Sequence, residues 1–154
     1  MNGYTPGLFD RLLGGAGTPS RLSLEQLKDA VARDLEDLLN TRAAFPQALL
    51  EGYPECASSI LNYGLIDFAG MCLSSADDRA TICASLKTAI ERHEPRLRNV
   101  QARLEREAGA INRVNFVISA TLAASASEMV CFDAVLQPST LQYSIHRSAR
   151  GTTV

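Results

Sequence analysis

The spacing of hydrophobic residues changes along the chain, from a helical period before Pro95 to a two-residue period after it. The clearest helical segment follows Ser23, where apolar residues recur every three or four positions as far as Leu38. Ser23 and Gln26 form a capping-box sequence, which predicts where this helix begins, and Asn40 is a suitable end. Its apolar stripe comprises Leu24, Leu27, Val31, Leu35 and Leu38.

Two further helices are predicted between this segment and Pro95. A short one is expected over residues 54–61, because proline is favoured at the first helical position. A longer one begins near Asp77 or Asp78, whose carboxylates suit a helix N-terminus. It ends before Pro95, which disfavours helical geometry at the residue that precedes it. The predicted buried stripe of the longer helix is Ile82, Leu86, Ala89 and Ile90.

After Pro95, four segments alternate apolar and polar residues and are predicted to be β-strands. The connections between them are short, including residues 137–140, which favours antiparallel pairing. Helices followed by strands predict an α+β fold, with the N-terminal helices packed on one face of a mostly antiparallel sheet of about four strands. The residues expected to be buried together are Leu27, Val31, Leu35, Ile82, Leu86, Phe116, Ile118 and Phe132.

The N-terminal segment differs from the rest of the chain. Residues 8–13 are predicted to form a short apolar helix, and the glycine-rich residues 14–20 are predicted to be a flexible linker. The apolar side chains could bind a groove on a partner protein or pack on the protein's own domain, and both alternatives are open. They are Leu8, Phe9, Leu12 and Leu13. The predicted organisation is a short helix and linker over 1–20, a single domain over 21–147 and a frayed tail over 148–154.

Composition excludes several classes of protein. The chain has 154 residues, of which 46% are hydrophobic and 21% charged, which excludes wholesale disorder. The net charge is −2 and basic residues form no block, so nucleic-acid binding is not expected. No apolar run is long enough to span a membrane, and residues 1–10 do not resemble a secretory signal. The four cysteines lack metal-ligand spacing and are expected to be reduced and mostly buried, without a metal site.

Candidate catalytic chemistry is sparse. His93 and His146 are the only histidines, and neither lies in a recognisable nucleophile or metal motif. A binding or structural role is therefore favoured, with no catalytic residues and no cofactor. The enzyme alternative is a small glycosidase that uses Glu94 with Asp67 or another carboxylate, since such enzymes need two carboxylates.

The tetrapeptide 94–97, which joins the last predicted helix to the first strand, is the most informative motif. Glu94 precedes a proline, so its carboxylate should emerge from a non-helical corner close to several arginines. It could form a local ion pair, or it could bind an arginine of a partner while Arg96 orients it. Pro95 and Leu97 are expected to be structural residues of the corner, with Leu97 packed beneath it.

Several short motifs, taken in order over residues 7–146, resemble the TssE family of type VI secretion baseplate components. That family is similar to the lysozyme-like wedge protein of contractile-tailed phages. The sequence departs from the family pattern at Asp10, where glutamate is common, and at Ile66, where proline is frequent. The motifs lie at residues 8–12, 23–24, 40–42, 63–65 and 94–97.

The resemblance implies a structural protein, located in the cytoplasm at the inner-membrane-associated baseplate, and it does not imply glycosidase activity. Its implied partners are the TssF and TssG wedge proteins and the first layer of the TssB–TssC sheath. A free regulatory adaptor with the same fold is the other alternative. The residues expected to bind partners are Glu94, Arg96, Leu8, Phe9, Leu12 and Leu13.

Overall fold

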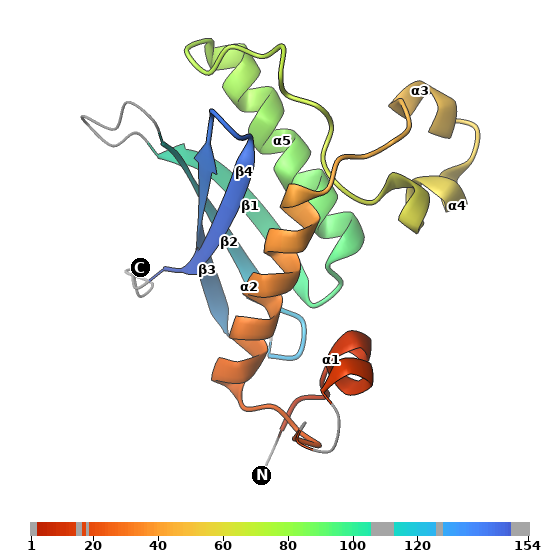
Figure 1. Ribbon diagram of the computed structural model, residues 1–154, viewed down its shortest axis with the longest axis vertical. Coiled ribbons are helices and arrows are strands. Elements are labelled where there is room, and N and C mark those ends of the chain that lie inside the picture. The colour runs from red at the N-terminus through yellow and green to blue at the C-terminus, as the bar shows by residue number, and fades with distance from the viewer. Residues whose placement is uncertain (1–2, 15–16, 18, 106–112, 126–127, 149–154) are drawn as a thin grey trace.

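The computed structural model describes residues 3–14, 17, 19–105, 113–125 and 128–148 (Figure 1). Helices come first and strands afterwards, as predicted. The elements are α1 (Leu8–Leu13), α2 (Leu24–Asn40), α3 (Gln47–Leu50), α4 (Pro54–Ala57), the 3-10 helix η2 (Ile60–Asn62), α5 (Ala76–His93), β1 (Leu97–Glu105), β2 (Val114–Leu122), β3 (Met129–Gln137) and β4 (Gln142–Arg147).

The four strands form one antiparallel sheet in the order β1-β2-β3-β4, so β1 and β4 are its edge strands. Helix α5 packs along β1 and helix α2 along β4, and both lie on the same face of the sheet (Figure 1). The α+β prediction, with helices on one face of an antiparallel sheet, is therefore confirmed.

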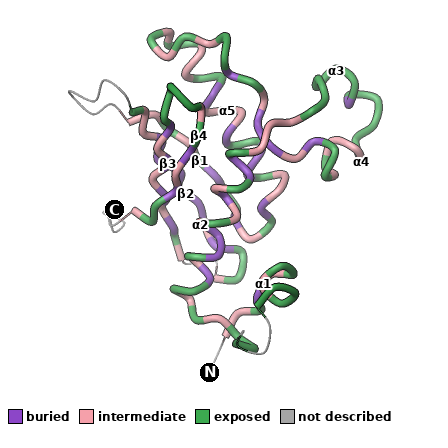
Figure 2. The backbone as a smooth tube through the Cα atoms, viewed as in Figure 1, coloured by how far each residue is buried: buried purple, intermediate pink, exposed green. Residues whose placement is uncertain are grey.

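The hydrophobic core lies between this helix layer and the sheet (Figure 2). All eight residues that were expected to be buried together belong to it. The capping box predicted for α2 is present, since the Ser23 side chain accepts from the Gln26 backbone and the Gln26 side chain accepts from the Ser23 backbone. The amphipathic spacing and its cap therefore located this helix correctly.

Side chains of α2 bind the outer edge of β4. The Asn40 side chain exchanges two hydrogen bonds with the Tyr143 backbone, at 2.9 and 2.8 Å, and the Glu36 carboxylate accepts from Ile145 N at 2.8 Å. An exposed strand edge otherwise invites pairing with another chain. A strand added at β4 would have to displace these side chains.

Three local features differ from the prediction. The helix expected over 54–61 is divided into α4 and η2, and α3 precedes it. Strand β1 begins at Leu97, before its alternating pattern starts, because a register shift with Asn99 at φ 52° lets Leu97 and Val100 both face the core. The thiols are not mostly buried. All four cysteines are free, Cys72 is exposed and the other three are half-buried.

The boundaries of the predicted terminal segments lie partly outside the described residues. The linker prediction over 14–20 includes residues 15, 16 and 18, and the tail prediction includes 149–154, none of which the structure describes. Ser148, the first residue of the predicted tail, donates its backbone N–H to Cys131 O at 3.0 Å.

Candidate functional site

The corner between α5 and β1 is a tight turn whose geometry the sequence dictates. The last helical hydrogen bond runs from Glu94 N to Ile90 O at 2.8 Å, and the turn closes with Leu97 N donating to Glu94 O at 3.1 Å. Pro95 occupies the second position of this turn, where its fixed φ is favoured. Leu97 is buried in the core beneath the turn.

The Glu94 carboxylate is turned towards Arg96. Glu94 is only 4% exposed, and its Oε1 accepts from the Arg96 backbone N at 3.1 Å and from Nε at 2.7 Å. Its Oε2 accepts from Arg96 Nη2 at 2.5 Å. Burial lowers the pKa of the Arg96 guanidinium, but the hydrogen bonds and charges of Glu94 and Asp34 outweigh burial, so the pKa is raised overall. The local ion pair that the sequence left open is therefore present.

A chain of alternating charges connects this corner to α1. Arg96 Nη2 also binds Asp34 Oδ2 at 2.5 Å, and Asp34 Oδ1 lies 3.7 Å from Arg33 Nε. Arg33 Nη2 in turn binds Asp10 Oδ1 of α1 at 2.5 Å. Exposed ion pairs of this kind contribute only about 0.2–1 kcal/mol each to stability. The main effect of the network is therefore to orient α1 on the domain.

The four apolar residues of α1 remain on the surface. Leu8, Phe9, Leu12 and Leu13 are 60–82% exposed, and α1 contains no buried residue (Figure 2). Two backbone hydrogen bonds between Tyr4 and Leu22, at 2.9 and 2.7 Å, hold the segment on its N-terminal side. A cluster of exposed apolar residues on a fixed support is typical of a surface that binds another protein.

The two groups of residues selected from the sequence are thus connected by a chain of ion pairs. The sequence indicated the corner and the N-terminal helix separately and missed the charged residues that connect them, which are Asp34, Arg33 and Asp10. A weak signal was available. Arg33 and Asp34 lie outside the apolar stripe of α2, on the solvent-facing side of that helix. The pattern could not show which partners they meet.

The two carboxylates named for a glycosidase, Glu94 and Asp67, are both hydrogen-bonded within this chain. Both carboxylate oxygens of Glu94 accept hydrogen bonds from Arg96, so neither is free to meet a substrate. The Asp67 carboxylate accepts from Ala69 N at 3.0 Å within its own loop.

In the described ranges, no three side chains of the types that bind metals come together as a possible metal site. No helix in those ranges is both long and apolar enough to cross a bilayer.

The chain was compared with known families and solved structures. The sequence model of a family described as "Baseplate wedge protein gp25" matches residues 25–127, which include nearly all of α2, α5 and the corner. A solved structure described as "The baseplate complex from the type VI secretion system" contains a similar chain, with 16% identity and a TM-score of 0.49. The similarity covers 73% of this chain and 96% of that chain. No curated protein matches the sequence.

Proposed function

Because this chain belongs to the gp25 family of baseplate wedge proteins, we propose that it is the wedge subunit that joins a type VI secretion baseplate to its contractile sheath. The observation that carries the proposal is the family match over residues 25–127. The TssE-like motifs in the sequence support the type VI assignment. The proposed location is the cytoplasmic side of the inner membrane, where such a baseplate assembles.

The exposed side of α1 is the proposed contact for the TssF and TssG wedge proteins. Its four apolar residues are accessible, and the bond from Asp10 to Arg33 fixes the direction in which they face. A helix of six residues is too short to be stable alone. Attachment to the body therefore lowers the entropic cost of presenting it to a partner.

The corner is the proposed contact for the first layer of the TssB–TssC sheath. Glu94 itself is nearly inaccessible, whereas the side chains of Arg96 and Asp34 are 28% and 40% exposed. We assign Glu94 the role of holding Arg96 in place, so that Arg96 and Asp34 meet the partner in a fixed geometry. Truncating one partner of a buried interfacial charge pair costs about 2–5 kcal/mol, which corresponds to roughly 30-fold or more in assembly.

The test combines fluorescence imaging of sheath foci with co-purification of TssF and TssG. We expect Glu94→Ala to fold, as judged by a circular dichroism melt, and to lose sheath foci. The matched control is Glu91→Ala, which removes an exposed carboxylate from the last turn of α5 and should keep the sheath foci. Leu97→Ala removes a core side chain and should act through stability, by about 2–5 kcal/mol.

The α1 surface is tested in the same assay. The double variant Phe9→Ser, Leu12→Ser should reduce co-purification of the wedge proteins without lowering the melting temperature. Met129→Ser, which removes an exposed apolar side chain from β3, is the control and should have no effect. Normal sheath foci in Glu94→Ala cells, or turnover of peptidoglycan that Glu94→Gln abolishes, would contradict the proposed function.

A further inference from the structure

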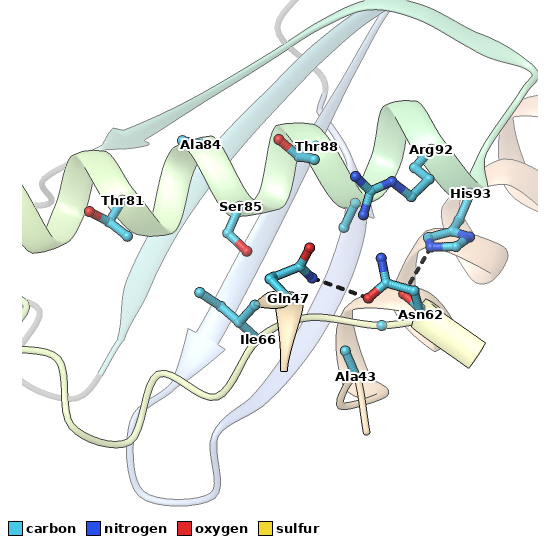
Figure 3. A pocket seen from close by; sticks show the side chains of 12 residues that line it. Ala43, Gln47, Asn62, Ile66, Thr81, Ala84, Ser85, Thr88, Arg92 and His93 are labelled. Carbon is cyan, nitrogen blue, oxygen red and sulfur yellow. Dashed lines mark hydrogen bonds between the residues drawn. The ribbon is translucent and has the colours of Figure 1, made fainter. Parts of the chain in front are cut away.

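A pocket of about 300 Å³ lies between α5 and a projecting arm, defined here as residues 43–63 (Figure 3). The arm contains α3, α4 and η2 and extends away from the helix layer (Figure 1). The side of the pocket formed by α5 carries small and polar residues, among them Thr81, Ser85 and Thr88. This pocket belongs neither to the corner nor to the α1 surface.

The inner wall of the pocket is formed by uncharged groups that are hydrogen-bonded to one another. Asn62 is 2% exposed, and its Oδ1 accepts from Gln47 Nε2 at 3.2 Å while its Nδ2 donates to Ala57 O at 2.9 Å. The His93 Nε2 lies 3.0 Å from Asn62 O. Burial lowers the pKa of His93 more than this hydrogen bond raises it, so His93 is neutral at pH 7 and donates to the carbonyl.

Arg92 supplies the charge of the pocket. Its guanidinium points towards Asn62 and Gln47, over the space between α5 and the arm (Figure 3). Among the described residues, none forms an ion pair or hydrogen bond with that guanidinium, and no carboxylate lines the pocket. A half-buried arginine beside hydroxyl and amide groups is suited to bidentate binding of a carboxylate.

The surface next to the pocket indicates that the carboxylate belongs to a protein. Leu49, Tyr53 and Ile60 of the arm are 61–84% exposed. Two of these, Leu49 and Ile60, lie two residues from Gln47 and Asn62, which line the pocket. Exposed apolar side chains beside a recess that holds an unpaired arginine are typical of protein interfaces.

We propose that the pocket receives an aspartate or glutamate side chain from an extended segment of a partner protein, whose apolar residues cover the arm. The proposal rests on the function proposed above, because that partner would be another baseplate or sheath protein. A side chain is favoured over a C-terminal carboxylate, since terminal carboxylates are usually captured by backbone N–H groups. The donors here are the side chains of Arg92, Gln47 and Thr88.

The probes are overlapping, C-terminally amidated peptides that cover the wedge and sheath proteins of the same secretion system. Their binding to the full chain is measured by fluorescence anisotropy. At least one acidic peptide should bind, and replacing its acid by the corresponding amide should weaken binding about tenfold or more. Arg92→Gln should weaken binding of the original acidic peptide by the same factor. In the Arg92→Gln chain, replacing the peptide's acid by the amide should then change the affinity very little, as expected for two groups that contact each other directly.

Lys87→Gln is the matched control, because Lys87 is an exposed cation on α5 that does not line the pocket. It should change binding by less than about twofold, as expected for a rim charge. The inference is overturned if no amidated peptide binds, if Lys87→Gln weakens binding as much as Arg92→Gln, or if binding requires a free C-terminal carboxylate. If the unmodified chain co-purifies with TssF and TssG but no peptide binds in a way that depends on Arg92, this inference alone is overturned. Failure of that co-purification would overturn the proposed function.

Discussion

The helices α1 and α2 carry similar apolar spacing, yet the structure uses them in opposite ways. Leu35 of α2 is fully buried between the sheet and α5, whereas Leu13 of α1 is 82% exposed. Helix α2 has 17 residues and lies against a complete sheet, while α1 has six residues and is attached through Asp10 to Arg33. An apolar stripe therefore stabilises the fold only where another element offers it a complementary surface.

The largest expected effect tests this contrast directly. Leu35→Ala should lower the free energy of unfolding by about 2–5 kcal/mol, because it leaves a cavity in a closed core. Leu12→Ala on α1 should change it by less than about 0.5 kcal/mol, as is usual for exposed positions. Urea unfolding followed by circular dichroism measures both. A similar loss in the two variants would show that α1 packs into the body in solution.

A second prediction concerns the attachment of the arm to the body. Gly64 has φ +117°, and a Cβ there would lie 2.5 Å from Thr41 O, where the returning chain pairs with the end of α2. Gly64→Ala should therefore destabilise the protein by about 1–3 kcal/mol.

The control for Gly64 is Gly52→Ala within the arm, where an added Cβ meets nothing within 4 Å. It should be nearly neutral or slightly stabilising in the same thermal melt. Equal destabilisation by both substitutions would show that the arm depends on its own conformation and not on its junction with α2.

The smallest expected effect concerns His93 and the dependence of stability on pH. Burial lowers the pKa of His93 below its ordinary value of 6.5, so the unfolded chain binds a proton there more readily than the folded chain. The contribution of His93 to stability is complete above pH 6.5 and is lost as the pH falls towards its folded pKa. His93→Gln should therefore reduce the dependence of the melting temperature on pH between about 5 and 7.

The baseline stability of His93→Gln will be lower at every pH, because the ring also contacts Tyr63 edge to face at 5.3 Å. The slope with pH is therefore the informative quantity, and an unchanged slope in His93→Gln would contradict the prediction.

The sequence by itself determined the order and faces of the main elements. The capping box at Ser23, the stripe through Leu35 and the alternation around Phe116 depend on local geometry, with periods set by the helix and the strand. Pro95 marked the end of α5 for the same reason, since its ring constrains the residue before it. These signals need no knowledge of what each segment packs against, and the structure agrees with them.

Only the tertiary structure decided which polar groups meet. The bond from Arg96 to Asp34 joins residues 62 positions apart, and the shift at Asn99 depends on the register with β2. The proximity of Arg92 to Gln47 arises because the chain leaves α2, forms the arm and returns beside α5 (Figure 1). Charged side chains on a helix surface have no periodic pattern that identifies a distant partner, so their pairing follows from how the helices and sheet pack.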